Sequence, residues 1–211
     1  MTTIAVPRVV VLTDRRQLPP GRTLGDQLEL LAGTGLTHVL LREHDLEDDD
    51  RHRLAERARS AGLAVWAARR PVPAAAGLHL PTSVPRPAGG LPWGRSCHDP
   101  GEVARAAADG ASWVTLSPFA PTASKPGYGP PVPRRWFGGL PVPALALGGI
   151  EARNAGDAIA AGAHGVALMG AAMRAQRPAG VVRAVVEAVA EAVAEAQAVQ
   201  RARAAAVGEG T

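Results

Sequence analysis

Residues 142–171, VPALALGGIEARNAGDAIAAGAHGVALMGA, decide the fold. An apolar run over 142–147 ends at a Gly-Gly pair, and a helical pattern follows around 155–161. A second apolar run over 165–169 then ends at another glycine. Short apolar runs bounded by glycine are typical of strands buried on both faces, as in parallel sheets. The stretch therefore predicts one strand–helix–strand unit.

The same unit recurs along the chain. Further strands are expected at 6–12, 37–41, 63–68, 77–80, 93–97 and 112–116. Helices are expected at 24–31, from the acidic run 45–50 to about 61, after Asp99, and from about 178 past 190. Residues 69–76 and 81–90 are rich in proline and small residues, so degenerate helices or loops are expected there. Eight alternations predict one α/β domain over 1–196, a (β/α)8 TIM barrel with short or degenerate helices after strands three, four and six. A doubly wound sheet is the structural alternative, but no GxGxxG motif follows the first strand.

Composition limits the class of protein. The chain has 211 residues, a net charge of +4 and one cysteine, Cys97, which excludes an internal disulfide. Because it lacks a signal-peptide layout and a long apolar run, we expect a cytoplasmic domain with no membrane partner. Because it lacks basic runs with interleaved aromatics, we expect no nucleic-acid partner. Residues 197–211 are expected to extend the last helix or to fray, and its Ala/Val surface could pair copies into a homo-oligomer.

In such a barrel the active site lies where the strands end. The loop 117–131 follows the sixth strand and holds Lys125, the only lysine, beside Thr122 and Ser124. An ammonium flanked by hydroxyls can meet a phosphate, although a solvated surface loop would have the same composition. Gly148, Gly149, Gly170 and Ala171 follow the last two strands, where small residues let the backbone approach an anion. Together they predict a phosphorylated substrate.

Among six histidines, His98 is the best candidate for acid–base chemistry. It ends the fifth strand two residues after Ser96, so both side chains should share one face. An imidazole can take up and return a proton near neutral pH. Asp99 is expected to cap the following helix, which argues against a Ser96/His98/Asp99 triad. His79 is expected to be a hydrogen-bonded core residue.

Seven motifs of the chain resemble those of the thiamine phosphate synthase and thiazole tautomerase superfamily. They are VLTD (11–14), VLLRE (39–43), GLHL (77–80), GRSCHD (94–99), SPFAPTASKPGYG (117–129), LGGIEARNA (147–155) and GAHGVALMGA (162–171). The resemblance implies a TIM barrel acting on phosphorylated thiazoles in thiamine biosynthesis.

Within this superfamily the synthase couples a pyrimidine pyrophosphate to a thiazole phosphate with Mg²⁺. The resemblance places its Asn-Asp pair at Ala67 and Ala68 and its loop Asp near Val84. These side chains offer no oxygen ligands, so we expect neither a metal nor another cofactor.

The tautomerase branch also lacks these ligands, and there the histidine after the fifth strand is the acid/base, which matches His98. We therefore expect a thiazole tautomerase, an isomerase that aromatises a thiazole carboxylate phosphate. In that reading Gly148, Gly149, Gly170 and Ala171 hold the phosphate, while Arg42, Thr122, Ser124 and Lys125 position the substrate and Ser96 supports the site. The alternatives are a thiamine phosphate synthase with metal ligands elsewhere in the chain, and a non-catalytic binder of phosphorylated ligands. Tyr128, the only tyrosine, lies in the same loop as Lys125.

Overall fold

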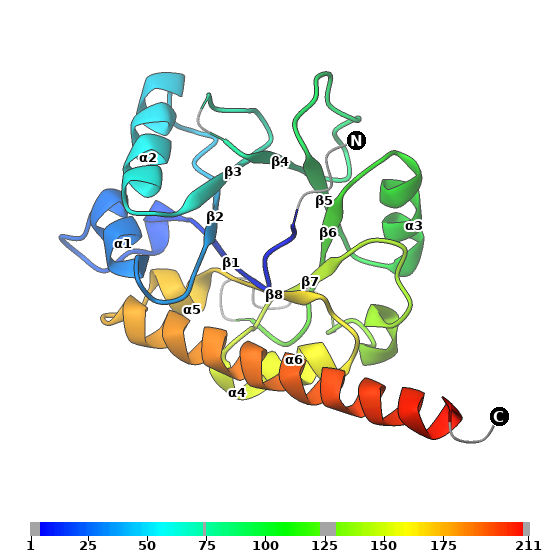
Figure 1. Cartoon of the computed structure of the whole chain (residues 1–211). Coiled ribbons are helices and arrows are strands. Elements are labelled where there is room, and N and C mark those ends of the chain that lie inside the picture. The colour runs from blue at the N-terminus through cyan, green and yellow to red at the C-terminus, as the bar shows by residue number, and fades with distance from the viewer. Residues whose placement is uncertain (1–4, 74, 123–129, 209–211) are drawn as a thin grey trace.

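The computed structural model describes residues 5–73, 75–122 and 130–208, in which eight parallel strands close into a barrel. Each strand pairs with the next in sequence, and β8 closes on β1, where Val10 lies opposite Ala167. Figure 1 shows the strands around one axis with the helices outside them. The strands are β1 (Val9–Leu12), β2 (His38–Leu41), β3 (Ala64–Ala68), β4 (Gly77–Leu80), β5 (Trp93–Cys97), β6 (Trp113–Leu116), β7 (Ala144–Leu147) and β8 (Gly165–Leu168). The predicted TIM barrel is confirmed, and the doubly wound alternative, which has open edges, is wrong.

The helices are unevenly distributed around this barrel. They are η1 (Arg15–Gln17), α1 (Leu24–Leu31), α2 (Asp48–Ser60), α3 (Pro100–Ala108), η2 (Arg134–Phe137), α4 (Ala152–Ala160), α5 (Gly170–Met173) and α6 (Pro178–Gly208). The described residues between β3 and β4, and between β4 and β5, contain no helix, and those between β6 and β7 contain only the short η2. The predicted degeneracy after strands three, four and six is therefore confirmed.

Several predicted boundaries are wrong by a few residues. β1 begins at Val9 instead of Val6, and β7 begins at Ala144 because Pro143 has no N–H to donate to a ladder. α4 starts at Ala152, earlier than predicted, because Glu151 and Asn154 form a reciprocal capping box. The 3-10 helix η1 after β1 was not predicted. These shifts leave the order of the elements unchanged, and among the carboxyl ends of the strands only that of β8 moves, by one residue.

The barrel interior is filled by two tryptophans together with aliphatic side chains such as Leu40 and Leu145. The indole rings of Trp66 on β3 and Trp113 on β6 stack with centroids 3.9 Å apart, and the His79 ring lies 4.9 Å from Trp113. Room for both indoles comes from glycines, because a Cβ on Gly77 would lie 2.9 Å from the Trp66 ring and one on Gly94 would overlap Trp113. The interior is therefore solid, and a ligand has access only to the mouth.

A second core lies between the strands and the helices. The outward-facing residues of the strands pack against apolar faces of α1, α4 and α6, including Val182, Val185 and Val189 of α6. Figure 1 shows α6 crossing one side of the barrel beside α4 and α5. The described part of the predicted tail, residues 197–208, continues α6 as helix. No described helix has the length and apolarity needed to cross a membrane.

Candidate active site

A cavity of about 330 Å³ opens at the carboxyl ends of the strands. All eight strands, or the segments that follow them, contribute to its lining. Of the predicted site residues, those in the described part of the chain line it, namely Arg42, Ser96, His98, Thr122, Gly148, Gly149, Gly170 and Ala171. Ser124, Lys125 and Tyr128 fall outside the described residues. The structure thus brings the candidates together at one mouth, and their roles stay predictions.

His98 is held by a carboxylate from the helix that follows it. Its Nδ1 lies 3.2 Å from Oε2 of Glu102, and its backbone N–H donates to the same oxygen at 2.7 Å. A carboxylate can only accept, so this contact places the ring proton on Nδ1 and a basic lone pair on Nε2. The imidazole is 40% exposed, which leaves it accessible from the cavity. This arrangement suits a group that takes up and returns a proton.

The neighbours of His98 have other tasks. Asp99 accepts from the backbone N–H of Glu102 at 2.8 Å and caps α3, with Pro100 as its first residue. The predicted cap is therefore confirmed, and Asp99 is occupied away from a Ser96/His98 triad. Cys97 is buried, and burial raises the pKa of its thiol to about 12. Such a thiol is not a nucleophile near neutral pH.

His79, on β4, also lines the cavity. Its side chain is 6% exposed, and its Nε2 lies 3.3 Å from the Thr115 hydroxyl, as expected for a hydrogen-bonded core residue. Burial, with a smaller contribution from the Arg42 charge, lowers the pKa of His79 to about 3. The ring is therefore neutral at physiological pH, which suits it to packing and hydrogen bonding and not to carrying a charge.

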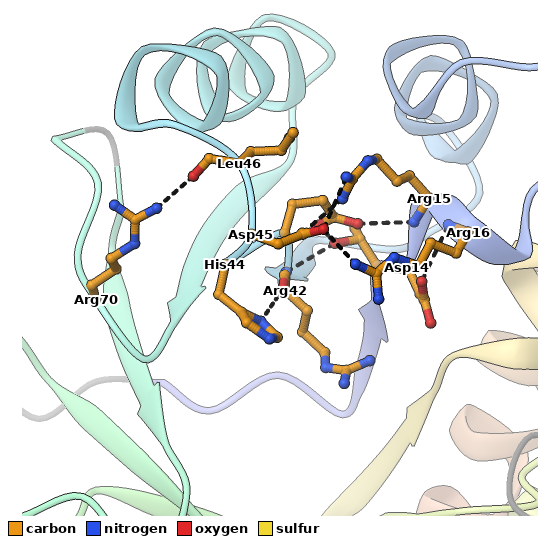
Figure 2. A network of polar contacts seen from close by, with 10 residues as sticks. Asp14, Arg15, Arg16, Arg42, His44, Asp45, Leu46 and Arg70 are labelled. Atoms are coloured by element: carbon orange, nitrogen blue, oxygen red, sulfur yellow. Dashed lines mark hydrogen bonds and ion pairs between the residues drawn. The ribbon is translucent and has the colours of Figure 1, made fainter.

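Arg42 reaches into the cavity from the end of β2. Its backbone N–H donates to the Thr13 hydroxyl at 3.0 Å, and its guanidinium contacts Sδ of Met169, the residue after β8, at 2.6 Å. Figure 2 shows its side chain extending away from the ion pairs that Asp45 makes with Arg15 and Arg16. In the described part of the chain Arg42 itself makes no ion pair with a carboxylate. Its charge is thus available to an anionic ligand.

Carboxylates near Arg42 are engaged by groups other than Arg42. The hydrogen bond from Arg15 holds the pKa of Asp45 well below its usual range. The buried carboxylate of Glu43 accepts from the Thr13 hydroxyl and from the backbone N–H of Arg15. Asp14 caps η1 and accepts from Gln17 at 2.7 Å. These acids fix the loops after β1 and β2.

The turn Gly148-Gly149 packs closely against the loop after β6. Both residues have left-handed φ, +98° and +65°, and a Cβ on Gly149 would lie 2.7 Å from the Ala120 carbonyl oxygen. The backbone N–H of Ala120 donates to the Gly148 carbonyl at 3.0 Å, which joins the two loops. The described residues provide no hydrogen-bond acceptor for the N–H groups of Gly149, Gly170 and Ala171. Such N–H groups can donate to a bound anion.

A magnesium ion does not fit the residues at the end of β3. Ala68 presents a methyl group to the cavity, and the next lining residue, Arg69, adds a positive charge. Behind the strand, the buried Arg51 donates to the carbonyl oxygens of Ala68 and Arg70 at 3.2 and 3.0 Å. The described residues contain no group of three or more His, Cys, Asp or Glu side chains that could hold a metal. The charge at this position is opposite to that of a cation site.

Sequence reasoning missed several residues of the site. Glu102 is absent from the predicted site residues, although its spacing of four residues from His98 at a helix start could have indicated the contact. Arg69 was missed because its left-handed φ of +67°, unusual for a side chain of this size, is not visible in the sequence. Arg174 lines the cavity from the residue after α5, where no motif points to it.

Comparisons with known proteins find one family over part of the chain. A family model described as thiamine monophosphate synthase matches residues 86–172. Over these residues the chain is similar to the thiamine phosphate synthase and thiazole tautomerase superfamily.

Individual relatives of the superfamily cover only part of the chain. A thiamine-phosphate synthase from Methanoculleus marisnigri is 46% identical over 71 residues, or 32% of this chain and 34% of the relative. A thiamine-phosphate synthase from Chromobacterium violaceum is 41% identical over 95 residues, which are 43% of this chain and 45% of the relative. The matches thus span less than half of these relatives. The fold is shared with a solved structure of thiamine phosphate pyrophosphorylase from Pyrococcus furiosus. The two superpose with a TM-score of 0.73 and 21% sequence identity, and the match covers 88% of this chain and 96% of the other.

The superfamily match is confined to one part of the barrel. Residues 86–172 include His98, Thr122 and the glycines after β7 and β8, whereas Arg42, Ala67 and Ala68 lie outside them. The names of the matched relatives fit the synthase alternative better than the tautomerase prediction. The superfamily match therefore does not cover the segment that distinguishes the two branches.

Proposed function

We propose that the chain is an enzyme of thiamine biosynthesis that binds a phosphorylated thiazole at the barrel mouth. The uncompensated charge of Arg42 and the backbone N–H groups of Gly149, Gly170 and Ala171 support an anionic ligand there. This statement is common to the tautomerase and the synthase, and it agrees with the names of the relatives.

For the reaction, we propose a thiazole tautomerase that needs no metal. The observation that carries this proposal is the His98–Glu102 contact in a cavity whose β3 edge is Ala68 and Arg69. His98 would remove a proton from one atom of the substrate through Nε2 and return it to another. Glu102 would stabilise the imidazolium in between. The proton is conserved and no group leaves, so no cation is needed to neutralise a pyrophosphate.

The second candidate is a thiamine phosphate synthase. The names of the matched relatives favour it, and so does the description of the family model. It would require Mg²⁺ ligands that are not carried by Ala67 and Ala68. The two candidates therefore make opposite predictions about dependence on magnesium.

The deciding experiment measures two reactions with the full chain. The first is conversion of the exocyclic thiazole carboxylate phosphate tautomer in EDTA, by wild type, His98→Ala and His52→Ala. His52 lies on α2, outside the cavity lining, and controls for loss of an imidazole elsewhere. Turnover by wild type and His52→Ala, but not by His98→Ala, supports the tautomerase.

The second reaction is coupling of the pyrimidine pyrophosphate to the thiazole phosphate with Mg²⁺. Coupling, together with no conversion of the tautomer, would replace the tautomerase with the synthase. Binding of the phosphorylated thiazole without either reaction would leave the non-catalytic binder.

A further inference from the structure

We propose that Arg174 is an anion-binding residue of the cavity and holds the phosphate of the ligand above Gly170. This inference rests on the proposed binding of a phosphorylated ligand and adds a residue to it. It does not depend on which reaction the enzyme catalyses.

The first support is the position of the Arg174 guanidinium. Arg174 follows the short helix α5 and lines the cavity together with Gly170 and Ala171. A Cβ on Gly170 would lie 2.6 Å from Nη2 and 2.8 Å from Cζ of Arg174. The guanidinium therefore rests directly on the backbone of Gly170, in space that only glycine leaves open. It lies beside the N–H groups of the same loop, so one anion can receive hydrogen bonds from both.

The second support is the way in which this side chain is held. Nη1 of Arg174 donates to Oε1 of Gln17 at 2.5 Å, and Nε2 of Gln17 donates to Oδ2 of Asp14 at 2.7 Å. Asp14 is in turn fixed as the N-cap of η1. The amide of Gln17 thus orients the guanidinium without neutralising it, because an amide carries no charge. Direct contact with Asp14 would have cancelled the charge that an anion needs.

The third support is a contrast with arginines in the segments that follow β1 and β7. Arg15 and Arg16 pair with Asp45, and Arg153 pairs with Glu151 at 2.7 Å. Glu151 also lines the cavity, but that contact and its capping of α4 engage its carboxylate. Within the described residues no carboxylate pairs with Arg174. Together with Arg42, it gives the cavity positive charge that a dianion such as phosphate would balance.

The test is a calorimetric titration of the full chain with each of three probes. The probes are inorganic phosphate, the phosphorylated thiazole and the corresponding unphosphorylated thiazole alcohol. Because a charge-assisted hydrogen bond is lost, Arg174→Gln should bind both phosphate-bearing probes roughly tenfold more weakly or worse. Its affinity for the alcohol should be unchanged, a phosphate-specific difference that a purely structural role for Arg174 would not produce.

Three further variants make the test specific. Arg177→Gln removes an exposed arginine outside the cavity lining and should bind all three probes as wild type does. Gln17→Glu leaves the Arg174 guanidinium in place but pairs it with a carboxylate, so it should weaken phosphate binding. Arg174→Lys keeps a positive charge, so it should retain part of the phosphate affinity.

The outcomes separate the two proposals. If wild type and Arg174→Gln bind the phosphorylated thiazole equally well, the role of Arg174 is refuted and phosphate binding stands. If wild type binds neither phosphate-bearing probe, both this inference and the proposed function fail. Thermal melting of each variant without ligand checks that the fold is intact.

Discussion

One oxygen of Glu102 lies 2.7 Å from the backbone nitrogen of His98 and 3.2 Å from its Nδ1. The first turn of α3 therefore fixes both the main chain and the ring of the candidate acid/base. Because Asp99 caps that turn, the orientation of the imidazole is tied to the start of the helix.

Glu102→Gln should lower kcat about tenfold or more, because loss of a carboxylate that orients a functional imidazole typically has that effect. His98→Ala should lower kcat by a factor of at least about a hundred. Asp99→Asn changes the neighbouring carboxylate to an amide that can still cap α3, so its kcat should stay near that of wild type. Steady-state kinetics on the three variants checks this order, and equal kcat for Glu102→Gln and wild type would contradict it.

Gly149→Ala should destabilise the protein more than Gly139→Ala does. The two glycines have nearly the same φ, +65° and +69°, so the backbone strain of an alanine is matched. A Cβ on Gly149 would lie 2.5 Å from the Pro121 oxygen, whereas nothing lies within 4 Å of one on Gly139. We expect about 1 kcal/mol for the strain and a further roughly 1–3 kcal/mol for the contact at Gly149, measured by urea unfolding. Equal losses of stability in the two variants would show that the loop after β6 moves to accommodate the added Cβ without cost.

Stability should fall as the pH drops below about 6.5, where an unfolded histidine begins to take up a proton. The pKa of His79 is lowered to about 3 by burial, and burial also lowers the pKa values of His38 and His164. The unfolded chain therefore binds more protons in this window, and stability present above pH 6.5 is lost towards pH 3. Each such group adds up to about 1.4 kcal/mol per pH unit to the slope.

The variant His79→Gln isolates the contribution of His79. Its free energy of unfolding should change less with pH than that of wild type between about pH 6 and pH 4, because one titrating group is gone. Urea unfolding at a series of pH values measures both slopes. Parallel slopes would assign the pH dependence to other groups.

Arg69→Gly should stabilise the protein by about 1 kcal/mol, because glycine adopts a left-handed φ without steric cost. Arg69→Ala removes the same side chain but keeps a Cβ at φ +67°, so it should lack this gain. The difference between the two variants in urea unfolding isolates the backbone contribution. An alanine variant as stable as the glycine variant would show that Arg69 is unstrained.

The sequence was sufficient for the fold because apolar runs, caps and turns agreed with one another. The strand β4 (Gly77–Leu80), the strand β5 (Trp93–Cys97) and the helix α1 (Leu24–Leu31) have the predicted bounds. Each is bounded by residues with strong local preferences, such as the capping box of Thr23 and Asp26. Boundaries were missed where a single residue decides, as Pro143 and Glu151 do.

The site was only partly predictable, for a physical reason. Knowing that the strands end at one mouth was enough to predict which residues, His98, Ser96 and the glycines among them, would meet there. The partners of those residues depend on side-chain directions that a linear pattern does not carry. Gln17 and Arg174, 157 positions apart, meet only because β1 and β8 are neighbours in the closed barrel.

The stacked indoles of Trp66 and Trp113 also give the protein a built-in optical reporter. They come from β3 and β6, which are not adjacent, so their 3.9 Å stack exists only when the sheet has closed. Rigid packing of two such rings should give near-ultraviolet circular dichroism bands that weaken when either is replaced by phenylalanine. Because α6 and the other helices dominate the far-ultraviolet signal, comparison of the two spectral regions during refolding would time barrel closure separately from helix formation.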